Sequence, residues 1–129
     1  MTLNAGAGNV TVEDMGTDVN DVILTGTTIS IDGTIETADL SGSDPGGITL
    51  NGALTLAGNV TLDTDSGNGP ISVTGAVNAS NAGTETLTIS SGSGAVDFGG
   101  AIGGTTALGD TTINASGTGT IAIAAIGDA

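Results

Sequence analysis

The chain has 129 residues, the size of one domain, with 14 acidic residues, no Lys, Arg, His or Cys, and a net charge of −14. This composition excludes catalysis by a His, Cys or Lys nucleophile or base, and it removes the usual ligands of zinc and copper. The negative charge repels phosphate groups and no apolar run is long enough to span a bilayer, so we expect no nucleic-acid partner and no membrane insertion.

One short phrase recurs along the chain: apolar, any, apolar, any, glycine, small, apolar. In chain order its copies occupy residues 10–13 (degenerate), 29–35, 48–54, 71–77, 96–102 and 121–126 (one residue shorter). Their first residues lie 19, 19, 23, 25 and 25 positions apart. A recurrence of this size is typical of a chain that winds into the rungs of a solenoid.

A second alternating segment precedes most copies of the phrase, at residues 22–25, 60–63, 87–90 and 111–114. Alternation with a period of two predicts β-strands rather than helices. An antiparallel meander would alternate in the same way, but similar strands recur only once in each long repeat, so like must stack on like in parallel. We therefore predict an all-β parallel β-solenoid of about six turns of 19–25 residues, forming a single domain over residues 1–129.

The ends of this predicted solenoid are uncapped, because neither carries a helix or a polar cap. An apolar strand such as 121–126 at an open end is an edge to which further strands can add. We expect both ends to continue into similar coils, either within a longer chain or by head-to-tail stacking of copies. Adjacent repeats or neighbouring copies are thus the expected partners.

Short hydroxyl side chains fall at outward positions of the predicted strands. One expected column contains Thr11, Ser30, Thr49 and Ser72, and a second contains Thr61, Thr88 and Thr112. Such ladders make an ice-binding solenoid a remote alternative, although Asp97 and Ala122 interrupt the first column.

Two acidic clusters are candidate calcium sites, and calcium is the only cofactor that the sequence suggests. Residues 63–69 partly resemble an Asp-x-Asp-x-Asp-Gly loop with ligands Asp63, Asp65 and Asn68, although Gly67 takes the third ligand position. The second cluster contains Asp14, Asp18, Asn20 and Asp21. The carboxylate pair of the first cluster could also serve a glycosidase, but the chain has no Trp or Tyr to stack on a sugar, so we predict no enzymatic activity.

The stretch 87–126 resembles the repeats of giant secreted bacterial β-helix proteins, the filamentous-haemagglutinin-like adhesins and autotransporter passengers. Residues 95–110, AVDFGGAIGGTTALGD, carry the resemblance most closely, and residues 1–86 match it more loosely. The resemblance implies a right-handed β-helix, secretion to the extracellular space or the bacterial cell surface, and a role as shaft or adhesive fibre. It carries over no catalytic residue.

We therefore expect a non-enzymatic rod or fibre segment of an extracellular, adhesin-like or filament-forming bacterial surface protein. The alternative is a calcium-dependent binding module. Its irregular loops, at residues 14–21 and 38–47, would then present a surface to a host cell or a glycan.

Overall fold

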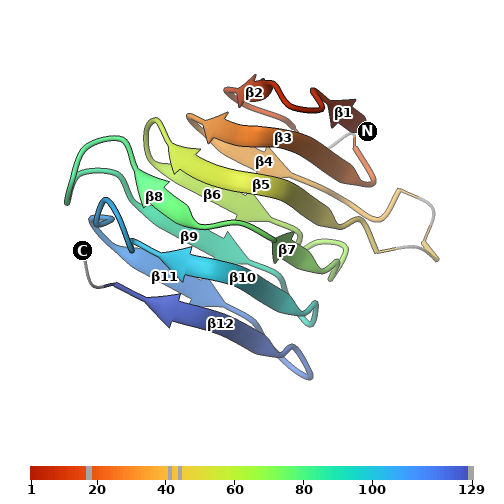
Figure 1. The fold of residues 1–129 in the computed structure, drawn as a ribbon. Coiled ribbons are helices and arrows are strands. Elements are labelled where there is room, and N and C mark those ends of the chain that lie inside the picture. The colour runs from red at the N-terminus through yellow and green to blue at the C-terminus, as the bar shows by residue number, and fades with distance from the viewer. Residues whose placement is uncertain (17–18, 41, 44, 128–129) are drawn as a thin grey trace.

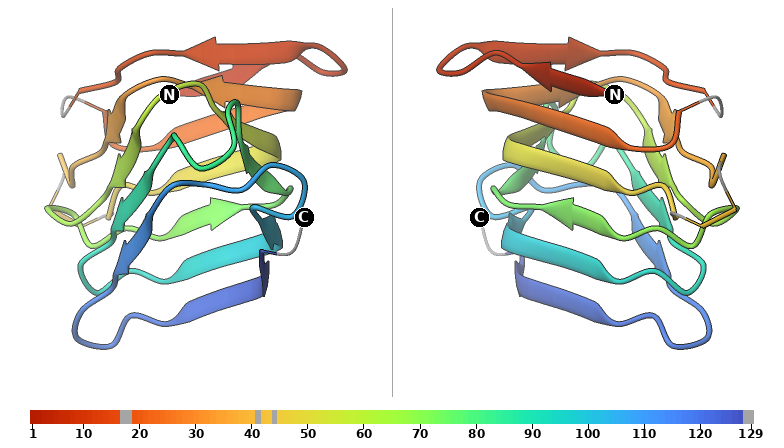
Figure 2. Two further views of the ribbon diagram at one scale, coloured as in Figure 1. Left: turned by 90° about the vertical axis from the view of Figure 1, so that its left-hand side faces the viewer. Right: turned by 90° about the vertical axis from the view of Figure 1, so that its right-hand side faces the viewer.

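The computed structural model describes residues 1–16, 19–40, 42–43 and 45–127, and this part contains β-strands and no helix. The chain winds around one axis and lays each coil beside the previous one (Figures 1 and 2). The strands are β1 (Thr2–Asn4), β2 (Asn9–Val12), β3 (Val22–Ile31), β4 (Thr34–Glu36), β5 (Ile48–Leu56), β6 (Val60–Asp63), β7 (Ile71–Val73), β8 (Val77–Ala79), β9 (Leu87–Ser90), β10 (Val96–Ile102), β11 (Thr111–Asn114) and β12 (Ile121–Ile126). The predicted parallel β-solenoid is confirmed, and the chain makes about five turns where about six were predicted.

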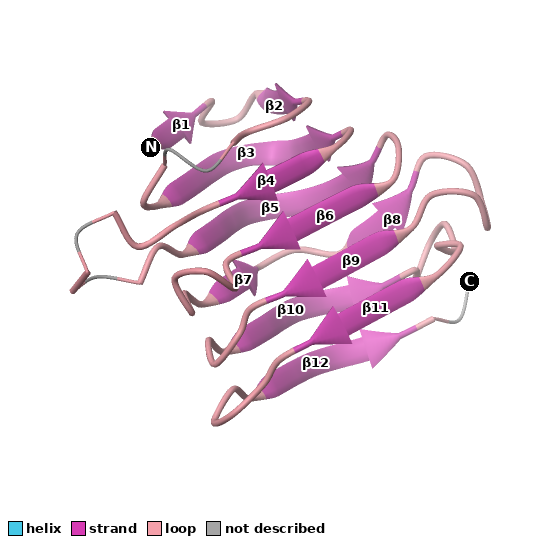
Figure 3. Cartoon of the chain, turned by 180° about the vertical axis from the view of Figure 1, so that it is seen from behind, coloured by secondary structure: helices cyan, strands magenta, loops and turns pink. Residues whose placement is uncertain are grey.

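The strands form two parallel sheets. The larger sheet has the order β1-β3-β5-β7-β10-β12, with β2 beside β3 and β8 between β5 and β10. The smaller sheet has the order β4-β6-β9-β11 and faces the viewer in Figure 3. Each coil of the larger sheet is divided at a bend, so three walls surround the interior. Wall 1 contains residues 1–4, 22–25, 48–51, 71–73, 96–98 and 121–123, wall 2 contains residues 9–12, 28–31, 53–56, 77–79, 101–102 and 125–126, and wall 3 is the smaller sheet.

The predicted alignment of the repeats is wrong in the first half of the chain. Ile48 lies beside Val22, and Ile29 lies beside Leu54 in wall 2. Thus the structural equivalent of 48–54 in the preceding coil begins at Val22. Segment 29–35 has the same residue pattern but a different position, because Gly33 lies at the corner between β3 and β4 and Gly52 lies at the bend within β5. The register shifts between Thr25 and Thr28, where the bend of β3 holds one residue more than the bend of β5, and this extra residue hides the match.

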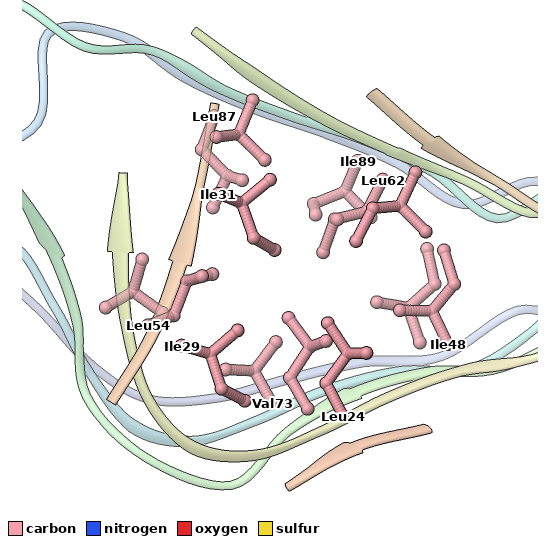
Figure 4. Packing of buried hydrophobic residues seen from close by; sticks show 14 of the residues in the cluster. Leu24, Ile29, Ile31, Ile48, Leu54, Leu62, Val73, Leu87 and Ile89 are labelled. Carbon is pink, nitrogen blue, oxygen red and sulfur yellow. The ribbon is translucent and has the colours of Figure 1, made fainter. Parts of the chain in front are cut away.

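With this register, the inward side chains of successive coils stack in apolar columns. Figure 4 shows side chains from all three walls pointing toward one another. The columns are Val22, Ile48, Ile71 and Val96 and then Leu24, Leu50, Val73 and Phe98 in wall 1, Ile29, Leu54, Val77 and Ile102 in wall 2, and Ile35, Leu62 and Ile89 in wall 3. Every one of these side chains is at most 2 % exposed. Their burial is the main apolar stabilisation of the fold.

Two corners are lined by stacked glycines, because the backbones there approach too closely for a side chain. At the bend between walls 1 and 2, a Cβ on Gly52 would overlap the carbonyl oxygen of Gly26, and one on Gly75 would overlap that of Gly52. At the corner that enters wall 1, a Cβ on Gly69 or Gly94 would overlap the glycine carbonyl of the preceding coil. The glycines thus allow the coils to keep their spacing through the turns.

Buried hydroxyl groups close the corner that leaves wall 3. Thr37, Thr64 and Ser91 are fully buried, and each hydroxyl donates a hydrogen bond to a glycine carbonyl of its own coil: Gly46 (2.7 Å), Gly69 (2.6 Å) and Gly94 (3.0 Å), respectively. In the described part of the chain, every buried polar side-chain atom has a hydrogen-bond partner. The corners are therefore held by specific buried hydrogen bonds, as the walls are held by their backbone hydrogen bonds.

The glycine stack predicts that the effect of a Gly→Ala substitution on stability depends strongly on its position. Gly52→Ala places its Cβ against a backbone carbonyl that is fixed in the inter-coil ladder, and we expect a loss of about 3 kcal/mol in the free energy of unfolding. The control is Gly16→Ala, whose Cβ would meet no atom of the described residues beyond its chain neighbours within 4 Å and should change stability by less than about 0.5 kcal/mol. Equal effects of the two variants in denaturant titrations would contradict the stacking.

Candidate functional site

The outer face of wall 3 presents the most regular polar surface of the chain. Thr34, Thr61, Thr88 and Thr112 lie in register in one column, which confirms the predicted threonine column and extends it by one residue. The neighbouring column contains Glu36, Asp63, Ser90 and Asn114. The other predicted hydroxyl column is split between two walls: Thr11 pairs with Ser30 in wall 2 and Thr49 pairs with Ser72 in wall 1. The expected link between Ser30 and Thr49 is wrong, because Ser30 pairs with Thr55 while Thr49 pairs with Ile23. The face is therefore a threonine ladder beside a mixed polar column with two carboxylates, Glu36 and Asp63.

In the first candidate calcium loop, at residues 63–69, two of the three candidate ligands accept hydrogen bonds from within the protein. The Asp63 carboxylate accepts a hydrogen bond from the Asp65 backbone amide (2.8 Å). The Asn68 side-chain oxygen accepts bonds from the Ser93 amide (2.9 Å) and hydroxyl (3.1 Å) in the next coil. Asn68 holds a φ of 58°, a left-handed conformation that asparagine tolerates better than most residues. Asp65 is exposed.

The second acidic cluster also binds backbone amides of the next coil. Asp14 accepts a hydrogen bond from the Thr34 amide (2.8 Å), and Asp21 accepts one from the Gly47 amide (2.9 Å). Asn20 accepts a bond from the amide of Leu40 (3.2 Å). Asp18 lies outside the described residues.

Asparagine and aspartate therefore share one structural role, which the sequence did not reveal. Their side-chain oxygens cap amides of the following coil at corners where the backbone ladder is interrupted; Asn59 and Asn78 cap Thr86 and Thr105–Thr106 in the same way. Among the described residues, no three acidic side chains converge as a metal-binding group. Within the described ranges no third acidic side chain joins Asp63 and Asp65 in such a group, and calcium binding stays a prediction.

Among the residues that the structure describes, Glu85 is the one buried carboxylate, and it lies in the turn between β8 and β9. It is 4 % exposed and accepts hydrogen bonds from the Asn81 amide (2.9 Å), the Asn81 side chain (2.8 Å) and the Ser80 hydroxyl (3.1 Å). These bonds, those from Asn81 above all, hold the pKa of the Glu85 carboxyl below its ordinary value. This carboxylate serves the turn, since all of its described partners lie within it.

The two end faces of the stack differ from the rest of the surface. β1 and β2 pair on one side only, and β11 and β12 do so at the opposite end. Apolar side chains are exposed in these strands and at Met1, which precedes β1: Met1 is 50 % exposed and Leu3 37 %, while Ile121 is 47 % and Ile126 70 % exposed. Beside β12, Ile102, Leu108 and Ile126 line an open groove of about 430 Å³. The candidate functional site is thus the pair of end faces, where the core columns reach solvent.

No protein-family model, curated protein or solved structure matches the chain. Within the described residues, the structure has no helix long and apolar enough to cross a membrane.

A substitution at Asn68 distinguishes a capping role from a calcium-binding role. Asn68→Gly keeps the left-handed backbone accessible but removes both bonds from Ser93, so we expect a loss of about 1–2 kcal/mol in unfolding free energy. The loss should be the same in calcium chloride and in a chelator. A melting temperature that calcium raises in the natural chain, and that it does not raise in Asn68→Gly or Asp65→Ala, would instead support the predicted calcium site.

Glu85 predicts a specific dependence of stability on pH. Because its folded-state pKa is lowered, the carboxylate stabilises the fold above its ordinary pKa, and this contribution is lost as the pH falls through the folded value. Glu85→Gln should therefore melt below the natural chain at neutral pH and approach it in acid. Glu13→Gln, at an exposed position, controls for the lost charge. A constant difference between Glu85→Gln and the natural chain at every pH would contradict this role.

Proposed function

We propose that the chain is a structural rod segment, an acidic β-solenoid shaft of an extracellular adhesin-like or filament-forming protein, with no catalytic role. The observation that carries this proposal is the continuity of the apolar columns from one end face to the other. Walls, corners and caps all serve the stacking of coils. A chain built in this way supplies length and stiffness, since each coil contacts only its neighbours.

The surface chemistry supports a place outside the cell. The chain has no Lys or Arg, so proteases that cut after basic residues find no site in it. Its net charge of −14 keeps the sides of neighbouring rods apart. Four candidate calcium ligands, Asp14, Asp21, Asp63 and Asn68, already accept hydrogen bonds from backbone amides, which favours a shaft over a calcium-dependent binding module.

The rod function predicts additive length. Two copies can be joined in frame by a duplicate of residues 103–120 placed after Ile126. Ile126 occupies the register position of Ile102, so the duplicate begins where residues 103–120 begin in the natural chain. It then leads back to wall 1, where the second copy starts. Wall 1 has the strand order β1-β3-β5-β7-β10-β12, six rungs, so each added copy should lengthen the particle by about 29 Å.

Small-angle X-ray scattering of one, two and three copies measures this increment. A glycine–serine linker of the same length is the matched control and should give flexibly joined particles. If the in-frame tandem scatters like the flexible control, the chain is not a shaft segment.

A further inference from the structure

We infer that the end faces of two copies of this chain bind each other head to tail, with β12 of one copy pairing in parallel with β1 and β2 of the next. This inference rests on the proposed rod function and names its partner. Three observations carry it: the register of the columns, the precedent inside the chain and the absence of charge on the edge strands.

The apolar columns end on apolar residues at both faces in the same register. The first column of wall 1 runs from Met1, whose neighbour Thr2 pairs with Ile23, to Ile121. The second runs from Leu3 to Ile123, and the wall 2 column runs from Val10 to Ile126. If a copy is moved along the axis by its own length, Ile121 meets Met1, Ile123 meets Leu3 and Ile126 meets Val10. The joint then continues each column without interruption.

The same pairing of strands already exists within the chain. β7 and β8 are two short strands held between two continuous ones, β5 and β10. β1 and β2 are likewise two short strands, and β3 covers one side of them. β12 is a single strand through both walls and would cover the open side. The proposed joint thus repeats an arrangement that already occurs within the fold.

Charge does not oppose the joint at its contact surface. Although the net charge is −14, the edge strands read TLN, NVTV and IAIAAI and contain no acidic residue. Edge strands that remain solvent-exposed are commonly protected by charge or proline, and these three have neither. Because the acidic residues elsewhere still repel, added salt should strengthen the association.

The joint closes walls 1 and 2 but leaves one rung of wall 3 unfilled, because β12 and β1 belong to consecutive rungs of wall 1 with no described wall 3 strand between them. The groove of Ile102, Leu108 and Ile126 lies at this gap. We therefore expect association that is reversible and grows with protein concentration. A heterologous contact of this kind does not close on itself, so it produces filaments of increasing length.

Engineered cysteines test the register directly, because the natural chain has none. Thr2 and Ala122 occupy the two ends of one outward column in wall 1, so Thr2→Cys mixed with Ala122→Cys should form a disulfide-linked dimer under mild oxidation. Asn4→Cys is the matched control: it lies on the same outward side of β1 but two residues out of register, and should give a several-fold lower yield with Ala122→Cys. Equal yields for the two mixtures would overturn the inferred register.

Charge placed on the edge tests the surface independently of disulfide chemistry. Ile126→Asp should keep the fold, because the side chain is 70 % exposed, and should abolish the salt-dependent increase in mass seen by sedimentation. Leu40→Asp, at a residue that is 59 % exposed away from the edge strands, should leave that increase unchanged. A natural chain that sediments as a monomer at high concentration and high salt would overturn the inference. The in-frame tandem would still report on the rod function, so the two failures are distinguishable.

Discussion

The structure depends on the parallel backbone ladder that holds successive coils about 4.8 Å apart around the turn. At that spacing each side chain contacts the side chain at the equivalent position one coil away. The residues at each position must therefore pack well against the equivalent residues of the adjacent coils. Inward positions satisfy this with aliphatic side chains, and Phe98 is stacked between Val73 and Ile123. Corners satisfy it with glycine, since a Cβ on Gly52 would overlap the backbone of Gly26.

The same constraint explains the polar residues. Where the ladder is interrupted at a corner, an amide of the next coil needs an acceptor, and a short asparagine or aspartate side chain supplies it, as Asn68 does for Ser93. Buried hydroxyls satisfy the glycine carbonyls at another corner, as Thr64 does for Gly69. The asparagine, aspartate, threonine and serine side chains named above thus stabilise the stacking of the coils, as expected for a shaft.

The sequence predicted the fold class because alternation and period are direct consequences of the ladder, and the copies at 48–54, 71–77 and 96–102 are aligned as expected. It misplaced the copy at 29–35, because one additional residue in the bend of β3 shifts the match and only the pairing of Val22 with Ile48 reveals it. It also took Asp14, Asp21 and Asn68 as candidate ligands. Composition identifies them as oxygen donors, but their partners lie 20 to 26 residues further along the chain and depend on the register.

Hydrogen exchange measured by mass spectrometry on peptic peptides tests the central claim, that the coils form one ladder open at both ends. In dilute protein we expect slow amide exchange in β5, β7 and β10 and fast exchange in β12, whose outer edge is unpaired. Concentrated protein in high salt should then protect β12 together with β1 and β2. Fast exchange in the central strands, or protection of β12 that does not depend on concentration, would contradict the account.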